Sequence, residues 1–508
     1  MQFTQGLHRS SKLYRSRTAT VFGDRSRSWG TIQERVARLA GGLASYGVER
    51  GDRVAIFDLN SDLYFEAYFA IAWAGCVAVP FNTRWAEAEV THALTDCMPR
   101  IVFLGSAFKS YSEQFARAGV TVIGIDEPIG GSSIEAVIWA NDAIEDRCGC
   151  GDDVAVIFYT GGTTGKSKGV MLSHNNLILN FFMMQAMHPH ATDAVYLHAA
   201  PMFHLADAAK IIGITMLGGT HVVLPGFAPA AVIEAIVQHQ VSDMMLVPTM
   251  IDMLCQALAA DPQNMSSIRS LTYGGSPIAE PVLKAALLAF PNARFCQAYG
   301  QTELSPCATI LEHRDHLGGR LRSAGRMVPG VDLRIVDSKM RTLAIGEIGE
   351  VAVRGANVMQ GYWGQPELTA QTIVGGWLRT GDAGYLDEDG FLYLVDRVKD
   401  MIVSGGENVY SCEVEQALLS HGDVLQCAVF GIPSEQWGEA VHAVVMVRPD
   451  ATVTPDDLLA HCGPLIANYK RPKSFELRHE PLPLSAVGKI LKTELRKPFW
   501  QGAERRIG

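Results

Sequence analysis

The sequence predicts an α/β protein that ends in a smaller mixed domain, and three observations support this. Short apolar runs alternate with helical patterns through the first 290 residues, which is typical of mostly parallel sheets covered by helices. From about Arg320 the pattern changes to short alternating segments separated by Gly or Asp turns, which favours a compact antiparallel sheet. From about Met401 to Gly508, mixed α and β patterns return.

Individual segments justify this fold class in chain order. The expected buried strands are Arg53–Phe57, Arg100–Leu104, Val120–Gly124 and Val154–Phe158, and the expected helices are Thr31–Tyr46 and Ala230–Gln240. The expected antiparallel strands are VDLRIVD at 331–337, GEVAVRG at 349–355 and FLYLVDR at 391–397. We find no internal repeat, low-complexity tract or long Pro/Gly/Ser linker, so a domain boundary is expected in a short hinge.

Composition excludes several classes of protein. Hydrophobic residues make up 48% and charged residues 19% of the 508 residues, so a large core can be buried and disorder is excluded as the main state. The net charge of −10 argues against nucleic acid as a partner, because phosphate binding requires a basic face. Ten cysteines are too sparse for a disulfide scaffold, and Cys148 and Cys150 lack the second pair that a metal site needs. Reduced thiols in a cytoplasmic protein are therefore expected.

The sequence contains no apolar run of the roughly 20 residues that a membrane span needs. Ala70–Phe81 is too short and contains Pro80. The basic N-terminus has no apolar stretch behind it, so a secretory signal is not expected, and a solvated N-terminal helix is favoured over a transit peptide. Four basic side chains there suit weak contact with an anionic membrane surface: Arg9, Lys12, Arg15 and Arg17.

The most informative segment is a glycine-rich loop, Tyr159-Thr-Gly-Gly-Thr-Thr-Gly-Lys-Ser-Lys-Gly169, which follows the strand expected at Val154–Phe158. Its glycines allow close backbone approach, and its N–H, hydroxyl and ammonium groups together favour anion binding. The Walker A pattern requires Gly, four residues and then Gly-Lys-Ser/Thr. Gly165-Lys166-Ser167 supplies that ending, but Thr160 stands where the first Gly is required. The loop therefore predicts phosphate binding outside the ordinary P-loop NTPases.

This loop resembles the phosphate loop of the adenylate-forming superfamily of acyl-CoA synthetases, adenylation domains and beetle luciferases. Further motifs of that family follow in its order: Ala200-Pro-Met-Phe-His204, Tyr273-Gly-Gly-Ser-Pro277, Tyr299-Gly-Gln-Thr-Glu303, Thr380-Gly-Asp382, Asp396-Arg-Val-Lys-Asp-Met-Ile-Val-Ser-Gly-Gly-Glu-Asn408 and Gly488-Lys-Ile490. The resemblance spans about residues 20–500. The sequence departs from it at Gly161, where Ser is usual, at Ser167, where Pro is usual, and at Pro483-Leu-Ser-Ala, where Pro-Arg/Lys-Thr is usual.

The resemblance implies a large N-terminal domain over residues 1–398, with two α/β subdomains and a small β-barrel-like subdomain, and a small mobile α+β domain over residues 399–508. It also implies an ATP-dependent carboxylic acid:CoA ligase, an AMP-forming acid–thiol ligase that uses Mg²⁺. A carboxylate attacks the α-phosphorus of ATP to give an acyl-adenylate and pyrophosphate, and the thiol of coenzyme A then displaces AMP. Because negative charge accumulates on phosphate oxygens, positioning and charge stabilisation would carry the catalysis.

Specific residues receive nucleotide roles from this resemblance. Glu303 would ligate Mg²⁺, which prefers hard carboxylate oxygens, while Thr302 would hydrogen-bond the α-phosphate and Tyr299 would lie against the adenine. Asp382 would accept hydrogen bonds from the ribose hydroxyls, and Arg397 would donate to ribose or phosphate. The other residues expected to bind ATP or AMP are Thr160, Gly161, Gly162, Thr163, Thr164, Gly165, Lys168, Gly274, Gly275, Ser276, Pro277 and Gly300.

The C-terminal domain would change position between the two steps. Lys489 would bridge the carboxylate and the α-phosphate, because a compact ammonium neutralises both anions as they meet. Lys399 occupies the hinge position of the family. After rotation, Ser404-Gly-Gly406 would line a pantetheine tunnel. The residues expected to bind coenzyme A are Ser404, Gly405, Gly406, Trp437, Tyr469, Lys470 and Arg471.

The acid-binding pocket is expected near His204, which is also a candidate catalytic residue. Amino-acid-activating domains place Asp at this position, so His204 argues against an amino-acid substrate. Asp207, Ala208 and Lys210 follow on the helix expected to border the pocket, and Asp207 and Lys210 are i,i+3 neighbours able to pair. Such a pair would indicate a substrate with polar groups beyond its carboxylate, whereas a pair that faces solvent or the domain interface would not. Fatty, aryl and terpenoid acids all stay open.

Several alternatives remain at this point. The nearest is an adenylating enzyme that loads a carrier protein instead of coenzyme A. An enzyme of one half-reaction, a luciferase-like oxygenase and a non-catalytic adenylate sensor are others. The residues do not decide the oligomeric state, and a homodimer is compatible with them.

Overall fold

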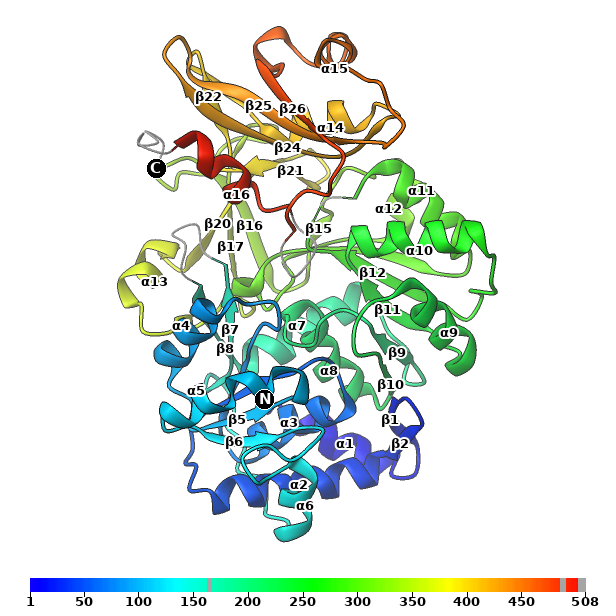
Figure 1. Cartoon of the computed structure of the whole chain (residues 1–508), viewed down its shortest axis with the longest axis vertical. Helices are drawn as coiled ribbons and strands as arrows, with labels where there is room; N and C mark the ends of the chain where they lie inside the picture. The colour runs from blue at the N-terminus through cyan, green and yellow to red at the C-terminus, as the bar shows by residue number, and fades with distance from the viewer. Residues whose placement is uncertain (162–166, 277, 485–489, 501–508) are drawn as a thin grey trace. The chain divides into compact units, whose positions relative to one another are not determined.

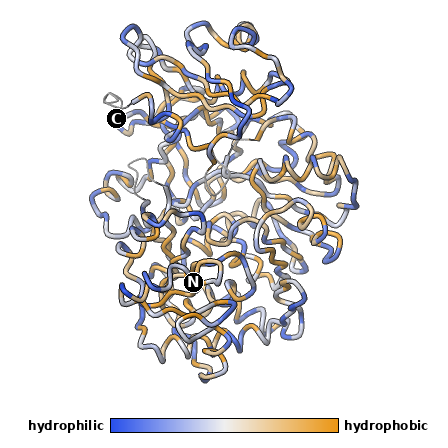
Figure 2. Tube along the Cα trace, viewed as in Figure 1, coloured by the Kyte–Doolittle hydropathy of each residue, from blue (hydrophilic) through white to orange (hydrophobic). Residues whose placement is uncertain are grey.

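The computed structural model describes residues 1–161, 167–276, 278–484 and 490–500, which form two compact units (Figure 1). Unit 1 comprises Met1–Asp332 and Val353–Leu378, and unit 2 comprises Leu333–Ala352 and Arg379–Gly508. Apolar and polar stretches alternate along the trace (Figure 2), as the α/β pattern requires. The predicted division into residues 1–398 and 399–508 concerns which segments move together in the reaction, and it stays a prediction.

The larger sheet of unit 1 has the strand order β15-β14-β13-β12-β11-β9-β10-β1-β2. The pairs from β13 to β1 are parallel, and β14, β15 and β2 are added antiparallel at the edges. Leu246, Tyr273 and Phe295 from three of the parallel strands are fully buried in its core. The bounds are β1 (Thr18–Phe22), β2 (Arg25–Ser28), β9 (Val195–His198), β10 (Thr220–Val223), β11 (Asp243–Leu246), β12 (Ser270–Gly274), β13 (Arg294–Tyr299), β14 (Thr309–Leu311) and β15 (Arg326–Met327).

The second sheet of unit 1 has the order β18-β8-β7-β4-β3-β5-β6. Its bounds are β3 (Arg53–Phe57), β4 (Val77–Pro80), β5 (Ile101–Leu104), β6 (Thr121–Gly124), β7 (Val154–Thr160), β8 (Lys168–Ser173) and β18 (Gly361–Tyr362). The four strands expected from the sequence are confirmed as β3, β5, β6 and β7. The pairs from β7 to β6 are parallel, whereas β8 pairs antiparallel with both β7 and β18.

Helices cover the sheets of unit 1, and the two expected helices are confirmed as α2 and α9. Ser28 begins α2 by accepting a hydrogen bond from Thr31 N, and Pro229 occupies the first turn of α9, where a missing N–H is harmless. The bounds are α1 (Gln5–Leu13), α2 (Trp29–Ser45), α3 (Asp62–Trp73), α4 (Glu87–Cys97), η1 (Ser106–Tyr111), α5 (Ser112–Arg117), α6 (Ile134–Ala140), α7 (His174–Met187), α8 (Leu205–Leu217), α9 (Pro229–His239), α10 (Pro248–Ala260), α11 (Glu280–Ala289), η2 (Thr302–Leu304), α12 (His313–Leu317) and α13 (Pro366–Thr372).

The N-terminal helix α1 is present, but the expectation that it is simply solvated is wrong. Leu7 and Ser10 are fully buried, and a Cβ added at Gly6 would lie 2.7 Å from Met216 Cγ of α8. One face of α1 therefore packs closely on α8. None of the described helices combines the length and apolar character that a membrane crossing requires.

Unit 2 contains most of a small β sheet and all of a separate α+β fold. The three antiparallel segments expected from the sequence are confirmed as strands β16, β17 and β21, and β20 pairs antiparallel with β21. In the first sheet, β21 (Leu392–Arg397) lies in unit 2 and β19 (Ile373–Val374) in unit 1. Three strands have residues in both units: β16 (Val331–Val336), β17 (Gly349–Gly355) and β20 (Trp377–Leu386). The second sheet comprises β23 (Glu407–Val409), β22 (Ile402–Ser404), β25 (Gly438–Val447), β24 (Val424–Ser434) and β26 (Ser474–Arg478). The helices of unit 2 are α14 (Ser411–Leu419), α15 (Pro455–Cys462), η3 (Asn468–Lys470), α16 (Lys492–Arg496) and η4 (Lys497–Trp500).

Candidate active site

The predicted phosphate loop connects two antiparallel strands. Thr160 at the end of β7 pairs with Lys168 at the start of β8. A P-loop connects a strand to a helix, so the topology agrees with the mismatch to the Walker A pattern. Gly161 is exposed, and an added Cβ there would meet nothing within 4 Å. The predicted residues Gly162, Thr163, Thr164 and Gly165 lie outside the described residues.

Side chains from distant segments hold the base of this hairpin. Tyr159 Oη donates to Asp96 Oδ2 at 2.5 Å, and Trp363 Nε1 donates to the backbone oxygen of Asp96 at 3.1 Å. His92 Nε2 donates to the backbone oxygen of Ser167 at 2.9 Å. These bonds fix both ends of the loop to α4. No local pattern in the sequence marks these bonds, because each joins residues more than 60 positions apart.

A buried carboxylate lies beside the hairpin. Glu303, in η2, is 9% exposed, and its Oε1 accepts a hydrogen bond of 2.9 Å from Tyr362 Oη. The ring of Tyr362 lies 5.1 Å from Lys168 Nζ, and Tyr362 pairs with Val170 of β8. Tyr362 therefore joins the predicted metal ligand to the phosphate hairpin. No sequence motif marks Tyr362 as part of the site, because it lies 59 positions from Glu303.

The carboxylate of Glu303 fits a magnesium ion. Its Oε2 has no hydrogen-bond partner among the described residues, and Mg²⁺ typically takes one or two protein carboxylates together with phosphate oxygens and water. The described residues contain no cluster of three or more His, Cys, Asp or Glu side chains able to hold a metal, so Glu303 would act with the phosphates of ATP. Thr302, the predicted α-phosphate donor, is the buried residue next to it.

Two predicted nucleotide motifs meet at the carboxyl ends of neighbouring strands. Gly274 at the end of β12 pairs with Ala298 of β13, directly before Tyr299. A Cβ at Gly274 would lie 2.3 Å from Ala298 O, and one at Gly300 would lie 2.0 Å from Pro306 O, so both positions require glycine. Gly275 and Ser276 follow in an irregular turn, and Pro277 lies outside the described residues. The carboxyl ends of parallel strands are the usual ligand-binding edge of an α/β sheet.

The predicted acid-binding residues lie at and behind the start of α8. His204 precedes the helix, and its Nδ1 accepts from Ala206 N at 3.4 Å. Asp207, Ala208 and Lys210 are all buried. The expected pairing of Asp207 with Lys210 is wrong, because Asp207 Oδ2 bonds His198 Nδ1 at 2.7 Å and Lys210 Nζ bonds the ring of His190. The solvent-facing alternative is wrong as well, since both side chains are enclosed.

In unit 2 the structure brings together the predicted ribose-binding residues. Asp382 Oδ1 lies 3.1 Å from Arg397 Nε, because β20 and β21 pair at these two residues. The turn before Asp382 is held by Glu350, whose Oε1 accepts from Gly381 N at 3.0 Å. Lys399 follows two residues after Arg397, and burial together with the nearby Arg397 charge lowers its pKa.

The residues expected to bind coenzyme A form two groups. Gly405 N donates to Trp437 O at 2.8 Å, and a Cβ at Gly405 would lie 2.9 Å from the indole ring. Gly405, Gly406 and Trp437 therefore form one exposed patch of unit 2, with both glycines at positive φ, and the adjoining Ser404 is buried.

The second group has structural partners. Lys470 Nζ pairs with Glu413 at 2.7 Å, and Arg471 donates to the backbone oxygen of Gly463 at 2.8 Å. Tyr469, next to them, is 41% exposed. The predicted catalytic Lys489 lies outside the described residues, although the flanking Leu484 and Ile490 form a β-bridge.

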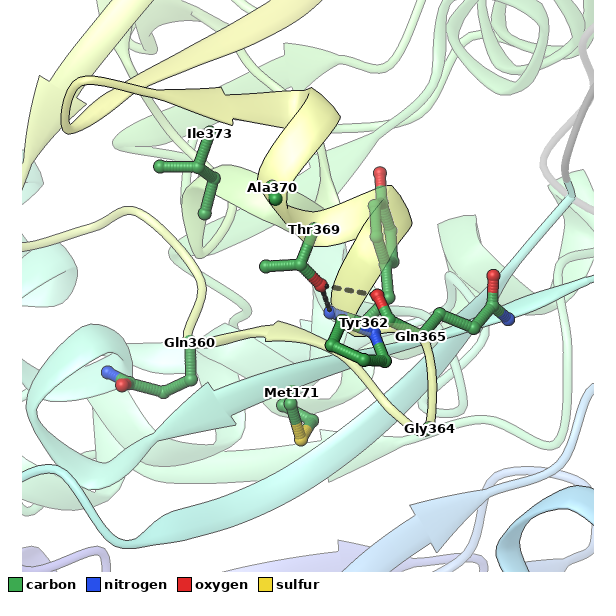
Figure 3. Close-up of a pocket in the computed structure, with 9 residues that line it drawn as sticks. Met171, Gln360, Tyr362, Gly364, Gln365, Thr369, Ala370 and Ile373 are labelled. Atoms are coloured by element: carbon green, nitrogen blue, oxygen red, sulfur yellow. Dashed lines mark hydrogen bonds between the residues drawn. The ribbon is translucent and has the colours of Figure 1, made fainter.

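A cavity of about 560 Å³ borders Tyr362 (Figure 3). The Tyr362 N–H donates to Thr369 Oγ1 at 2.9 Å, and the Thr369 hydroxyl donates to Gln365 O at 2.8 Å. The residues that line the cavity are Met171, Gln360, Tyr362, Gly364, Gln365, Pro366, Thr369, Ala370 and Ile373. This lining carries no charged side chain, so we do not assign the nucleotide to this cavity. These hydrogen bonds instead hold Tyr362 in place against α13.

The hairpin phosphate loop, the buried carboxylate joined to it and the glycines at the strand ends are features of the adenylate-forming acid–thiol ligases, and this is the class that the fold and site define. Residues 7–363 match the family model described as AMP-binding enzyme, and residues 413–489 match the AMP-binding enzyme C-terminal domain. Because the first match covers well over half of the chain, the protein belongs to the AMP-binding enzyme family.

Known relatives are similar over nearly their whole length. A feruloyl-CoA synthase from an Amycolatopsis species is 38% identical, over 95% of this chain and 96% of that protein. A fatty acid–[acyl-carrier-protein] ligase, ScoC from Streptomyces coeruleorubidus, is 34% identical, over 92% of this chain and 91% of that protein. The solved o-succinylbenzoate CoA synthetase of Bacillus subtilis, in complex with an acyl-adenylate intermediate, superposes with a TM-score of 0.87 at 29% identity, over 97% of each chain.

We expect Tyr362→Phe to lower the rate of pyrophosphate release about tenfold and to raise the Mg²⁺ concentration needed for half-maximal rate. The variant removes one hydrogen bond to a buried carboxylate, worth about 1.5–3 kcal/mol, while keeping the ring beside Lys168. The measurement is a Mg²⁺ titration of pyrophosphate release, with the exposed Tyr46→Phe as control. An unchanged Mg²⁺ dependence would contradict the positioning role.

Proposed function

We propose that the protein is an ATP-dependent carboxylic acid:CoA ligase that works in two steps through an acyl-adenylate. The observation that carries this proposal is the joint placement of Glu303, Tyr362 and Lys168 around the phosphate hairpin. A carboxylate that can hold Mg²⁺ and an ammonium next to an anion-binding loop are the groups that adenylation of an acid requires.

In the first step, a carboxylate oxygen of the acid attacks the α-phosphorus, and the bond from that phosphorus to pyrophosphate breaks. Bound Mg²⁺ would neutralise charge that develops on the phosphate oxygens. Glu303 would hold the ion, Thr302 would donate to the α-phosphate, and Lys168 with the hairpin backbone would receive the outer phosphates. His204 lies at the acid side, and Lys489 bridges the two anions. Tyr299 would lie against the adenine. The other residues that would enclose the nucleotide are Gly274, Gly275, Ser276, Pro277 and Gly300.

In the second step, the sulfur of coenzyme A attacks the acyl carbon, and the bond to AMP breaks. We propose that residues 399–508 rotate about Lys399 between the steps, while residues 1–398 keep the nucleotide, with Asp382 and Arg397 on its ribose. The patch formed by Gly405, Gly406 and Trp437, next to Ser404, would then admit the pantetheine arm, because glycine lets the backbone approach it closely. Tyr469, Lys470 and Arg471 would contact the phosphates of coenzyme A.

The second candidate is an enzyme that loads an acyl-carrier protein. The partners of Lys470 and Arg471 favour this candidate. Lys470 is paired with Glu413, and Arg471 donates to the backbone oxygen of Gly463, so both cations are less available to the phosphates of coenzyme A. The 34% identical relative named fatty acid–[acyl-carrier-protein] ligase supports the same alternative. An enzyme of one half-reaction only is a third case, and it differs from the CoA ligase because it forms no CoA thioester.

We propose a cytoplasmic protein, which the ten free thiols support. The basic side chains of α1 and the segment after it would give weak contact with an anionic membrane surface at most. A homodimer is compatible with the fold. For the acid, the 38% identical relative named feruloyl-CoA synthase favours aryl acids, and the relative named for fatty acids keeps that class open.

A panel of aryl and fatty acids tests the proposed function, with pyrophosphate release and CoA thioester formation measured separately on the full chain. We expect both products with at least one class of acid. Pyrophosphate without CoA thioester would favour carrier-protein loading or a single half-reaction. The absence of both products with every acid would contradict the proposal.

A further inference from the structure

A row of buried polar side chains runs from α8 to the start of β11 in unit 1. Lys210 Nζ lies 3.0 Å from His190 Nε2, and His190 Nδ1 lies 2.7 Å from Asp243 Oδ1. Lys210 is 5%, His190 6% and Asp243 3% exposed. The nucleotide chemistry described above uses none of these contacts.

The hydrogen-bond chemistry of this row assigns its protons. The Asp243 carboxylate can only accept, so His190 carries its proton on Nδ1 and presents Nε2 as an acceptor to the Lys210 ammonium. Burial is the main cause that lowers the pKa of both His190 and Lys210. One N–H of Lys210 is thereby satisfied. The other two have no hydrogen-bond partner among the described residues.

Other buried groups near Lys210 also have unfilled hydrogen-bonding capacity. Asp207 lies one helical turn before Lys210, and its Oδ1 has no partner within the described chain, although its Oδ2 bonds His198. The hydroxyl of Tyr196 is also buried and has no hydrogen-bond partner within the described chain. Burial raises the pKa of Tyr196, and the nearby Asp207 raises it further. Because buried polar groups are normally satisfied, these groups indicate that a polar ligand or water belongs among them.

The position of Lys210 connects this region to the predicted reaction centre. The buried thiols of Cys296 and Cys307 lie near Lys210. Cys296 lies in β13, which ends at Tyr299, and Cys307 follows Glu303 by four residues. Asn180 of α7 donates to Cys307 O at 2.7 Å, which fixes this segment beside the α7–α8 face. The ammonium therefore lies in the interior directly behind the strand and loop that carry the predicted nucleotide site.

The other side of the row closes this region from solvent. A second cavity of about 310 Å³ is lined by Pro189, His190, Ala191, Asp243, Arg269, Ser270 and Arg294. Its lining includes His190 and Asp243 but not Lys210, so these two side chains separate the ammonium from that opening.

The helix also provides a length scale. His204 stands at the start of α8, and Lys210 follows six residues later, roughly 9 Å along a helix with a rise of 1.5 Å per residue. An acid whose carboxylate lies near His204 would place atoms at its far end beside Lys210 when it spans about that length. A planar aryl-propenoic acid with an oxygen on the para carbon has a comparable span.

We propose that Lys210 recognises an oxygen-bearing group, a hydroxyl or a carboxylate, at the far end of the acid substrate. This proposal rests on the proposed function and adds its substrate class: an acid with a second hydrogen-bond acceptor opposite the reacting carboxylate. Asp243 and His190 act as positioning residues that hold the ammonium in place. A plain fatty acid or an unsubstituted aryl acid leaves the two N–H groups of Lys210 unfilled and is therefore a poor substrate.

The test compares matched acids on the full chain: cinnamic acid, 4-methylcinnamic acid, 4-hydroxycinnamic acid and 4-carboxycinnamic acid. The readout is the ratio of kcat/KM between each oxygen-bearing acid and its oxygen-free match, measured by pyrophosphate release. We expect at least one oxygen-bearing acid to be favoured by about tenfold or more, since a site built around polar groups rejects analogues that lack them. The hydroxyl and carboxyl arms show which group is recognised.

Lys210→Met keeps the length of the side chain without its charge and is expected to bring this ratio to within about threefold of one. Lys210→Gln keeps an N–H donor and is expected to retain part of the preference, and the exposed Lys284→Met on α11 is expected to match the wild type. The ratio is independent of the folded fraction, because both acids are measured on one preparation. A wild type without preference, or a Lys210→Met variant that keeps it, would overturn the proposal. No pyrophosphate release with any acid would contradict the proposed function itself.

Discussion

Glu303→Gln is expected to lower the rate of acyl-adenylate formation by at least about a hundredfold, on the scale of losing a group that stabilises transition-state charge. The variant keeps the shape of the side chain and the possibility of a hydrogen bond from Tyr362, but it replaces a carboxylate oxygen with a neutral amide. Magnesium would lose its protein ligand, and charge on the phosphate oxygens would be less well neutralised. The measurement is pyrophosphate release at saturating ATP and acid, across a titration of Mg²⁺.

The matched control for this variant is Glu367→Gln, which changes an exposed glutamate in the first turn of α13. We expect the control to behave as the wild type. The assignment of Glu303 fails if its variant releases pyrophosphate within about threefold of the wild-type rate at every Mg²⁺ concentration.

Lys489→Ala is expected to reduce acyl-adenylate formation by about a thousandfold, while conversion of supplied acyl-adenylate to thioester stays within a few-fold of the wild type. The ammonium is required only where two anions meet, and that encounter occurs in the first step alone. The two half-reactions are measured separately, the first by pyrophosphate release and the second by thioester formation from synthetic adenylate.

Lys497→Ala changes an exposed lysine in the same C-terminal segment and serves as the control. Equal loss of both half-reactions in Lys489→Ala would refute its assignment, because a residue needed for folding or for both poses would affect both steps. The split between the steps is also the simplest indication that different parts of the C-terminal domain serve them.

The parts of the fold that the sequence predicts are those whose signal is local. Buried strands such as Arg53–Phe57 are continuous apolar runs, and their parallel pairing follows from alternation with helices. Nucleotide motifs such as Gly274 and Gly300 are recognisable because a close backbone approach permits only glycine there. The hairpin topology of the phosphate loop has no such local signal, because Thr160 in place of the first Walker A glycine argues only against an ordinary P-loop NTPase.

The parts that the sequence does not reveal depend on partners far apart in the chain. Tyr362 reaches Glu303 across 59 residues, and no pattern around either residue announces the bond. Spacing alone predicted that Asp207 would pair with Lys210, but burial of α8 against the sheet gives each residue a histidine partner instead. For the same reason α1, which has a polar sequence, is not simply solvated: small residues on one face let it pack on α8.

In the proposed reaction, ATP is cleaved at its α-phosphorus to activate an acid, and the acyl group then passes to a thiol. The most direct measurement is a chase experiment, in which the full chain is incubated with ATP, Mg²⁺ and a turned-over acid, and coenzyme A is added afterwards. Before the chase, we expect pyrophosphate and enzyme-bound acyl-adenylate in equal amounts; after it, AMP and acyl-CoA in equal amounts. Formation of ADP and orthophosphate, or acyl-CoA without prior pyrophosphate release, would contradict this account.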